Sequence, residues 1–277
     1  MNFCLKAKIQ IFFHKMNRLF KLKIFLKSIQ TTKSKMLLSL LILFTFTLIY
    51  FNPKAGTNTW DKASRESANL VSLAQETPEA QVQFYSAKAY SWRGKFSQHT
   101  WIATKEKNAA SYLVYHVVLW GTSFGADGVV VVQPDLPDRR WFDAKPQIIF
   151  SAAGEKAEKL IPQIQAAAKS YPYQKFYRAY PGPNSNTFVS HVIREIPDLK
   201  IALPNNAIGK DWLCDKNGVK FFALSESKTG VQFSFFGMFG IILGLVEGLE
   251  INIIGLSFGV DFLHPALKLP GVGRVGF

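Results

Sequence analysis

The sequence predicts an α+β protein in which a mostly antiparallel sheet packs against two or more helices, behind an N-terminal transmembrane helix. Three patterns predict this class. An uncharged apolar run precedes the main domain, short β-branched runs follow it, and two later segments repeat apolar residues at helical spacing. The chain then divides into a basic cytoplasmic arm at 1–35, a transmembrane anchor at 36–52, a linker with a short helix at 53–81 and an extracytoplasmic domain at 82–277.

The predicted anchor is the run MLLSLLILFTFTLIYF, residues 36–51, which contains no charged residue. As a helix, these sixteen residues span about 24 Å, slightly less than the roughly 30 Å hydrocarbon core of a bilayer. Because basic residues precede the run, the positive-inside rule predicts a single pass through a bacterial inner membrane with a cytoplasmic N-terminus. A cleaved signal peptide stays open as the alternative.

The net charge of +14 does not indicate nucleic-acid binding, because the charge is unevenly distributed. Residues 1–36 hold nine of the 33 basic residues and none of the 19 acidic ones, so the rest of the chain has 24 basic and 19 acidic residues. That balance is ordinary for a folded domain, and we see no basic stripe in it. The two cysteines form no metal-ligand pattern, and we expect no metal and no cofactor.

Alternation and β-branched residues place strands at 82–89, 100–104, 111–120, 129–133 and 148–151. The loop Leu136–Ala144 and its flank carry three aspartates and two arginines at irregular spacing, which indicates a solvated charged loop. These charged residues are Asp135, Asp138, Arg139, Arg140 and Asp143.

The helical patterns cover residues 155–170, where Pro162 is expected to break or kink the helix, and a second segment that starts near Asn184. Residues 231–263 are apolar and punctuated by glycine, with Glu247 and Glu250 interrupting the run. We interpret them as two or three buried strands joined by turns, in preference to a second membrane span.

The stretch YPGPNSNTFVSHVIREIP, residues 180–197, joins a turn to an amphipathic helix that Pro197 ends. Asn184 is a favourable N-cap residue, and Ser185 then lies in the first helical turn. The positive end of the helix dipole there suits a nucleophile, or it suits a bound carboxylate or phosphate. The simpler alternative is that Asn184, Ser185 and Thr187 only cap the helix.

This stretch carries a resemblance to an uncharacterised bacterial envelope family, domain-of-unknown-function family 3750. Further matching motifs are LP..AIGKDW at 203–212, TG.Q.S..GMFG at 229–240 and GLEINIIGL at 248–256. The resemblance runs from about His99 to the C-terminus and implies no activity.

A more distant resemblance is to the circularly permuted papain-like hydrolases. Those enzymes place a His on one strand, a second polar residue on the next strand, and a nucleophilic Cys in an Asn-Cys-x-x-Phe motif at a helix N-terminus. Here Asn184-Ser185-Asn186-Thr187-Phe188 matches with Ser in place of Cys, and His99 and His116 occupy the strand positions. Serine is a weaker nucleophile than a thiolate and depends on a well-placed base.

The second resemblance implies a permuted papain-like fold and acyl transfer, with Ser185 as nucleophile, His99 as general base and His116 orienting His99. If they form a dyad, the Ser185 hydroxyl lies within roughly 3–3.5 Å of a His99 ring nitrogen. The resemblance also implies a substrate-binding or structural loop of six residues: Pro181, Gly182, Pro183, Asn184, Asn186 and Thr187.

Three functions stay open on the sequence. They are an amidase or esterase, an inactive relative that binds a lipid or a cell-wall ligand, and a structural membrane protein. The expected partners are membrane lipid and a small-molecule or peptide ligand of the envelope, without nucleic acid.

Overall fold

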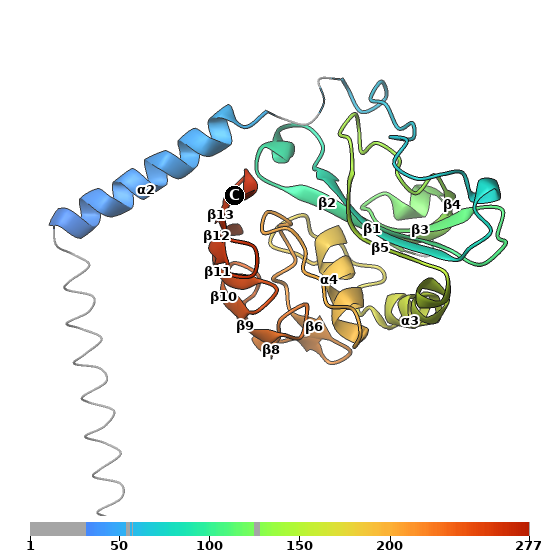
Figure 1. The fold of residues 1–277 in the computed structure, drawn as a ribbon. Coiled ribbons are helices and arrows are strands. Elements are labelled where there is room, and N and C mark those ends of the chain that lie inside the picture. The colour runs from blue at the N-terminus through green and yellow to red at the C-terminus, as the bar shows by residue number, and fades with distance from the viewer. Residues whose placement is uncertain (1–31, 54–55, 57, 125–127, 277) are drawn as a thin grey trace, which may run out of the picture. The chain divides into compact units, whose positions relative to one another are not determined.

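The computed structural model describes residues 32–53, 56, 58–124 and 128–276 (Figure 1). The chain forms two compact units, Met1–Leu48 and Ile49–Phe277, and each is described by itself. The predicted basic arm at 1–35 lies outside the described residues except for its last four positions.

The apolar N-terminal segment forms helix α2 (Thr32–Phe51), which has 20 residues. In the part of the chain that the structure describes, no helix has the length and apolar character needed to cross a membrane. The first four residues of α2, TKSK, are polar or basic, so the apolar run is limited to the sixteen residues after them. This finding overturns the predicted transmembrane anchor and the predicted single-pass location in a bacterial inner membrane.

A five-stranded antiparallel sheet with strand order β4-β3-β2-β1-β5 begins the second unit. Its strands are β1 (Gln81–Lys88), β2 (Gln98–Lys105), β3 (Tyr112–Val117), β4 (Val130–Asp135) and β5 (Gln147–Ala153). Each of them corresponds to a predicted strand. Short 3₁₀ helices interrupt the connections at η1 (Ala74–Glu76), η2 (Trp92–Lys95) and η3 (Gly121–Phe124).

Helices α3 (Glu155–Ser170) and α4 (Ser185–Glu195) cover one face of this sheet (Figure 1). The predicted helix at 155–170 is confirmed, and it continues through Pro162 instead of breaking there. Apolar side chains of both helices form one buried core with inward residues of the sheet, among them Phe84, Ile102, Ile164, Phe188 and Val192. The opposite face of the sheet carries a second cluster around Tyr85 and Trp101, against which Trp141 packs.

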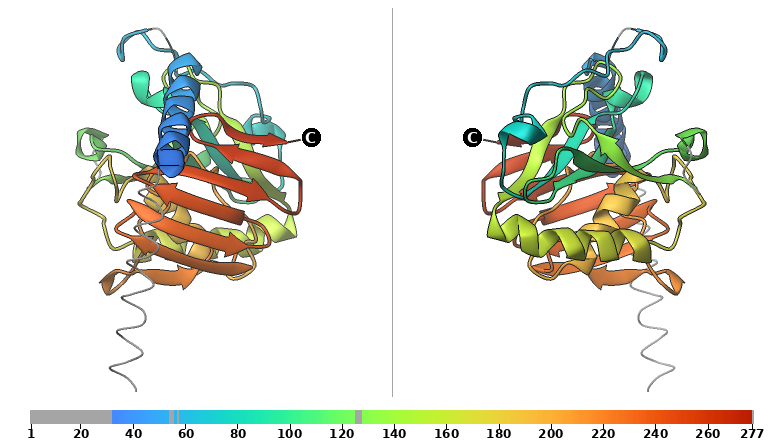
Figure 2. Two further views of the ribbon diagram at one scale, coloured as in Figure 1. Left: turned by 90° about the vertical axis from the view of Figure 1, so that its left-hand side faces the viewer. Right: turned by 90° about the vertical axis from the view of Figure 1, so that its right-hand side faces the viewer.

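The C-terminal region forms a second antiparallel sheet of seven strands in chain order, shown side by side in Figure 2. These strands are β8 (Phe222–Leu224), β9 (Gly230–Phe235), β10 (Phe239–Gly244), β11 (Gly248–Ile253), β12 (Leu256–Asp261), β13 (Ala266–Leu269) and β14 (Gly273–Gly276). A small hairpin, β6 (Cys214–Asp215) and β7 (Gly218–Val219), precedes them. Helix α4 lies between the two large sheets (Figure 1).

The predicted fold class therefore needs correction, because two separate antiparallel sheets replace the single sheet and the transmembrane helix is missing from the described residues. The prediction for 231–263 also changes, because this range contains four strands that are not buried on both faces.

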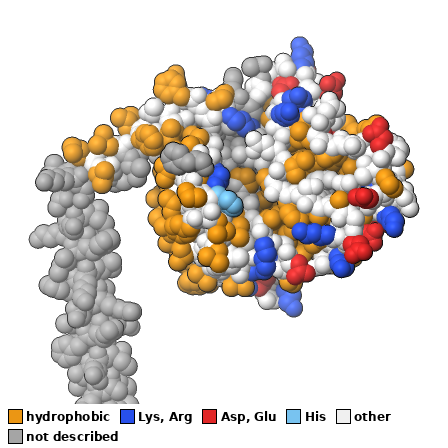
Figure 3. Space-filling model, viewed as in Figure 1, with side chains coloured by type: hydrophobic (Ala, Val, Ile, Leu, Met, Phe, Trp, Pro, Cys, Tyr) orange, Lys and Arg blue, Asp and Glu red, His pale blue; other side chains and the backbone are white. Residues whose placement is uncertain are grey.

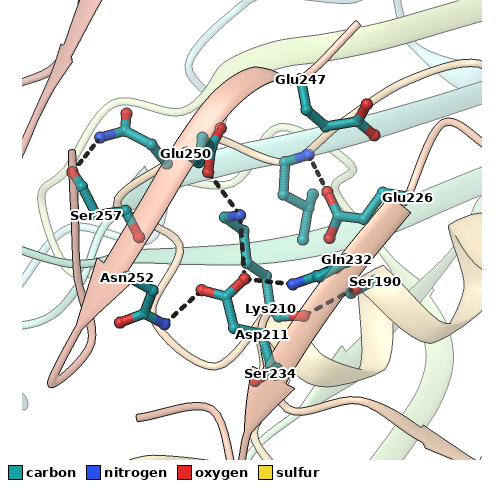
Figure 4. A network of polar contacts seen from close by, with 12 residues as sticks. Ser190, Lys210, Asp211, Glu226, Gln232, Ser234, Glu247, Glu250, Asn252 and Ser257 are labelled. Carbon is teal, nitrogen blue, oxygen red and sulfur yellow. Dashed lines mark hydrogen bonds and ion pairs between the residues drawn. The ribbon is translucent and has the colours of Figure 1, made fainter. Parts of the chain in front are cut away.

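A buried charge network joins the second sheet to the rest of its unit (Figure 4). Lys210 Nζ lies 2.9 Å from one carboxylate oxygen of Glu250 and 3.4 Å from Asp211 Oδ1. Lys268 Nζ lies 2.6 Å from the other oxygen of Glu250. All four side chains are at least nine-tenths buried, so their charges depend on one another for compensation.

Neutral polar side chains of the sheet complete this network. Gln232 Nε2 and Asn252 Nδ2 each donate to a carboxylate oxygen of Asp211 at 2.7 Å. Ser234 Oγ donates to the backbone carbonyl of Asp211 at 2.6 Å. These three residues are inward positions of β9 and β11. The polar face of the seven-stranded sheet is thus the buried one.

Candidate functional site

The segment PGPNSNTF forms the N-terminus of α4, and the predicted N-cap at Asn184 is confirmed. Asn184 Oδ1 accepts from the backbone N–H groups of Asn186 and Thr187 at 2.9 and 3.2 Å. The Thr187 hydroxyl in turn accepts from the N–H of Asn184 at 3.0 Å, which closes a capping box. The sequence predicted that N–H groups at this helix N-terminus could bind an anionic ligand. Two of them, those of Asn186 and Thr187, instead donate to the Asn184 side chain.

The same cap binds a loop that follows α4. Asn184 Nδ2 donates to the carbonyl of Ile208 at 3.0 Å, and Thr187 Oγ1 donates to that of Gly209 at 2.7 Å. Gly209 has φ +105°, and a Cβ there would lie 2.3 Å from the Asn184 amide. The AIGKDW motif therefore meets the PGPNSNTF motif through backbone that only glycine fits.

The cap also binds strand β2. Asn186 Nδ2 donates to the carbonyls of Gln98 and Ile208, at 2.8 and 2.7 Å, and Asn186 Oδ1 accepts from Thr100 Oγ1 at 2.9 Å. Every polar atom of the Asn186 side chain is consequently engaged inside the protein. The motif therefore connects β2, α4 and the 208–209 backbone through hydrogen bonds.

The preceding turn, Pro181 to Pro183, packs against Trp212 and Thr187. Gly182 has φ +133°, and a Cβ there would lie 2.9 Å from the Trp212 Cβ and 3.0 Å from Thr187 Oγ1. The carbonyl of Pro183 accepts from the N–H of Arg178 at 2.8 Å.

The structure does not bring Ser185 and His99 together. Ser185 is 6% exposed at the start of α4, and no hydrogen bond joins it to His99 among the described residues. Successive side chains of a strand point to opposite faces, and Thr100 and Ile102 of β2 face α4. His99 and Trp101 therefore face the other way, with the sheet between the imidazole and α4.

His99 and His116 do lie together, on the face of the sheet that α4 does not cover. His99 Nε2 and His116 Nδ1 are 3.5 Å apart, and the rings are stacked with centroids 5.7 Å apart. Trp141 stacks on His99 with a centroid distance of 3.6 Å. The two residues were predicted as neighbours on adjacent strands, and their catalytic roles stay predictions.

Both imidazoles are biased towards the neutral form. Burial lowers the pKa of His99 well below its usual value, and the neighbouring His116 lowers it further. Burial also lowers the pKa of His116 to about 4, although the Asp135 carboxylate partly opposes this shift. At neutral pH, the pair offers one hydrogen-bond donor and one acceptor per ring and carries no charge.

A pocket of about 330 Å³ opens beside His116. Its walls combine arginines with aromatic rings: Arg65, Arg139 and Arg140 with Trp120, Trp141 and Phe142. Further lining residues are Val118, Val131, Gln133, Pro134 and Asp135. His99, Ser185 and the PGPNSNTF turn do not line it.

Sequence reasoning missed the loop that builds this pocket. Residues 136–144 were predicted as a solvated charged loop, yet Asp138 is 1% exposed and accepts from Ser67 Oγ and the N–H of Leu70. Asp143 Oδ1 accepts from the N–H of Ser64 at 2.7 Å. The sequence feature that could have indicated this pocket is the run RRWF at 139–142, which places two cations beside two aromatic rings.

The three arginines differ in how far they are neutralised. Arg139 is ion-paired with Asp135 and donates to the Arg65 carbonyl. Arg65 lies over the Phe142 ring at 4.5 Å, and Arg140 donates to the Asp143 carbonyl at 3.3 Å. Within the described ranges, neither Arg65 nor Arg140 has an ion-pair partner. In the same ranges, no group of three His, Cys, Asp or Glu is arranged to hold a metal ion.

Comparison with known proteins yields one family. The family model described as "Protein of unknown function (DUF3750)" matches residues 79–212. The match includes both histidines, the RRWF loop and the PGPNSNTF motif, but it ends before the seven-stranded sheet, where the sequence resemblance was expected to continue. No curated protein and no solved structure matches the chain, so the papain-like resemblance gains no support. Through residues 79–212, the chain belongs to the DUF3750 family of proteins of unknown function.

Proposed function

We propose that this protein binds a small anion with a planar or apolar portion in the pocket beside His116. The observation that carries the proposal is the pair Arg65 and Arg140, next to stacked indole rings. Neither guanidinium group forms a salt bridge with a carboxylate among the described residues, although Arg140 is near enough to the Asp143 carboxylate to lower its pKa. Trp120 and Trp141 are stacked at 6.3 Å with an interplanar angle of 15°.

The chemistry of the lining matches such a ligand. Guanidinium groups bind carboxylate or phosphate oxygens in bidentate geometry, and indole faces stack on planar or apolar groups. The neutral His116 contributes a hydrogen bond without adding charge. A volume of about 330 Å³ lies at the lower end of the range for small-molecule sites, roughly 300–1,000 Å³.

Acyl transfer by Ser185 and His99 is less well supported by this geometry. General-base catalysis requires the hydroxyl within hydrogen-bond reach of the imidazole, whereas the alternation of β2 directs His99 away from α4. Ligand binding needs no such contact, because it depends only on the residues that line the pocket.

Calorimetric titration with 2-naphthoate and its neutral analogue 2-naphthamide tests the proposal. We expect the wild type to bind the carboxylate at least about tenfold more tightly than the amide, because only the carboxylate pairs with arginine. Arg140→Gln should remove that preference, while Arg93→Gln, an exposed arginine outside the pocket, should leave it intact. Equal affinity for the two compounds, or equal effects of the two substitutions, would refute the proposal.

A further inference from the structure

The seven-stranded sheet turns its apolar face outward. Figure 3 shows these hydrophobic side chains gathered along one side of the domain, over the C-terminal strands. Cross-strand pairing aligns them in three rows. We call these sixteen residues the apolar wall: Leu224, Val231, Leu243, Leu249, Val260, Leu267 and Val275; Phe222, Phe233, Ile241, Ile251 and Phe258; Phe235, Phe239, Ile253 and Leu256.

The orientation of the sheet is fixed by its other face. Glu250 and Asn252 of β11 alternate with the wall residues and are buried in the charge network around Lys210 and Asp211. Turning the strand over would expose apolar groups to that network and remove the carboxylate that pairs with Lys210. The wall is therefore held on the outside of the unit.

The wall is too large for an ordinary monomer surface. Eleven of its sixteen residues are 42 to 71% exposed. This leaves on the order of 1,000 Å² of apolar surface, against roughly 300–600 Å² for the largest patch on a typical monomer. A surface of this size and composition resembles half of a protein core.

We propose that a second copy of this chain covers the apolar wall, so that two seven-stranded sheets pack face to face. Two walls together would bury about 2,000 Å², within the range of obligate homodimers. A two-fold axis makes one patch its own partner, and an uncharged wall requires no matched donors or acceptors. Stacked sheets about 10 Å apart form the ordinary core of a β-sandwich.

The composition of the wall and its turns favours a protein copy over a lipid surface. The wall and the turns at 236–238, 245–247, 254–255, 262–265 and 270–272 contain no Lys, Arg, Trp or Tyr. These are the residue types that anchor proteins at lipid headgroups. In the remaining turn, the Lys228 ammonium is bound to the carbonyls of Ile193 and Ile196 at the end of α4.

Sedimentation equilibrium of the full chain tests the proposal. We expect a mass of twice 31.2 kDa at micromolar concentration. Ile241→Glu combined with Ile251→Glu should raise the dissociation constant of the dimer at least about 100-fold, because it would bury unpaired charges in the interface. The control is Leu40→Glu, an exposed apolar position of α2 outside the wall, which should remain dimeric.

Circular dichroism of each variant checks whether it is folded. If the Ile241→Glu/Ile251→Glu double variant fails to fold, the single change Leu243→Lys replaces it. A monomeric wild type overturns the proposal. So does a dimer that Leu40→Glu dissociates and the wall variants do not. Flotation with phosphatidylethanolamine–phosphatidylglycerol vesicles that is lost in the wall variants, with the mass unchanged, assigns the wall to lipid and also overturns it.

Discussion

At the scale of single residues, the side chain of Asn184 contributes more to the stability of the fold than that of Ser185 beside it. The Asn184 amide accepts two hydrogen bonds inside α4 and donates to the carbonyls of Ala179 and Ile208. The Ser185 hydroxyl makes no hydrogen bond to His99 in the described part of the chain. The polar residues at this helix start thus hold the protein's own backbone together.

Asn184→Ala should lower the free energy of unfolding by about 3 kcal/mol, because it removes a helix cap and leaves buried carbonyls without donors. Ser185→Ala is the matched control, and we expect it to cost less than about 1 kcal/mol. Urea unfolding followed by circular dichroism measures both. Equal losses for the two variants would mean that the cap is not the stabilising element.

His116 predicts a pH dependence of stability. Its pKa is about 4 in the folded state, against 6.5 when unperturbed, so the unfolded chain binds the extra proton between these values. The contribution is fully present above pH 6.5 and is lost as the pH falls towards 4, at about 1.4 kcal/mol per pH unit.

Between pH 7 and pH 5, His116→Gln should therefore lose about 2 kcal/mol less stability than the wild type, as read from urea midpoints. Subtracting the two profiles removes the contribution of the carboxylates, which titrate in both proteins. Parallel profiles would show that His116 does not carry this linkage.

At the scale of elements, the charge network decides how the second sheet attaches. Burial alone would lower the pKa of Lys210, but the carboxylates of Asp211 and Glu250 outweigh it and raise the pKa above its usual value. Burial alone would raise the pKa of Glu250, but the ammonium groups of Lys210 and Lys268 outweigh it and lower the pKa below its usual value. Lys210 and Glu250 are therefore both charged at neutral pH, and each compensates the buried charge of the other.

Lys210→Met should cost about 3–5 kcal/mol, because it leaves Glu250 and Asp211 buried with less compensation. Adding Glu250→Gln should bring the loss below the sum of the two single changes, since both remove the same ion pair. Chemical denaturation of the three variants gives the coupling energy. Strict additivity would contradict a shared network.

At the scale of the whole molecule, the family match ends at Trp212, but the compact unit continues to the C-terminus. A chain cut after Trp212 retains Lys210 and Asp211 and loses their partners in β9 and β11. It also exposes the side of α4 that Arg194 uses to bind Gln232.

We expect the fragment 1–212 to lack a cooperative thermal transition and the near-ultraviolet circular dichroism of the full chain, since it would expose buried charges and core surface. The full chain, treated identically, is the control. A sharp unfolding transition of the fragment would show that the matched segment folds without the second sheet.

The sequence by itself determined much of the secondary structure. Five strands of the first sheet, helix 155–170 and the N-cap at Asn184 follow from alternation, helical periodicity and capping preference, which are local properties. The polar motif was also recognisable, and it marks a real junction.

Only the tertiary structure decided which way the strands face. Period-two alternation shows that Glu250 and Asn252 share a face opposite Ile251, but it does not say which face is buried. The usual rule would bury Ile251, whereas Lys210 and Asp211, 40 residues earlier, supply charges that draw the polar face inward. The same ambiguity separated His99 from Ser185, because the face of β2 that α4 covers depends on packing between segments far apart in the chain.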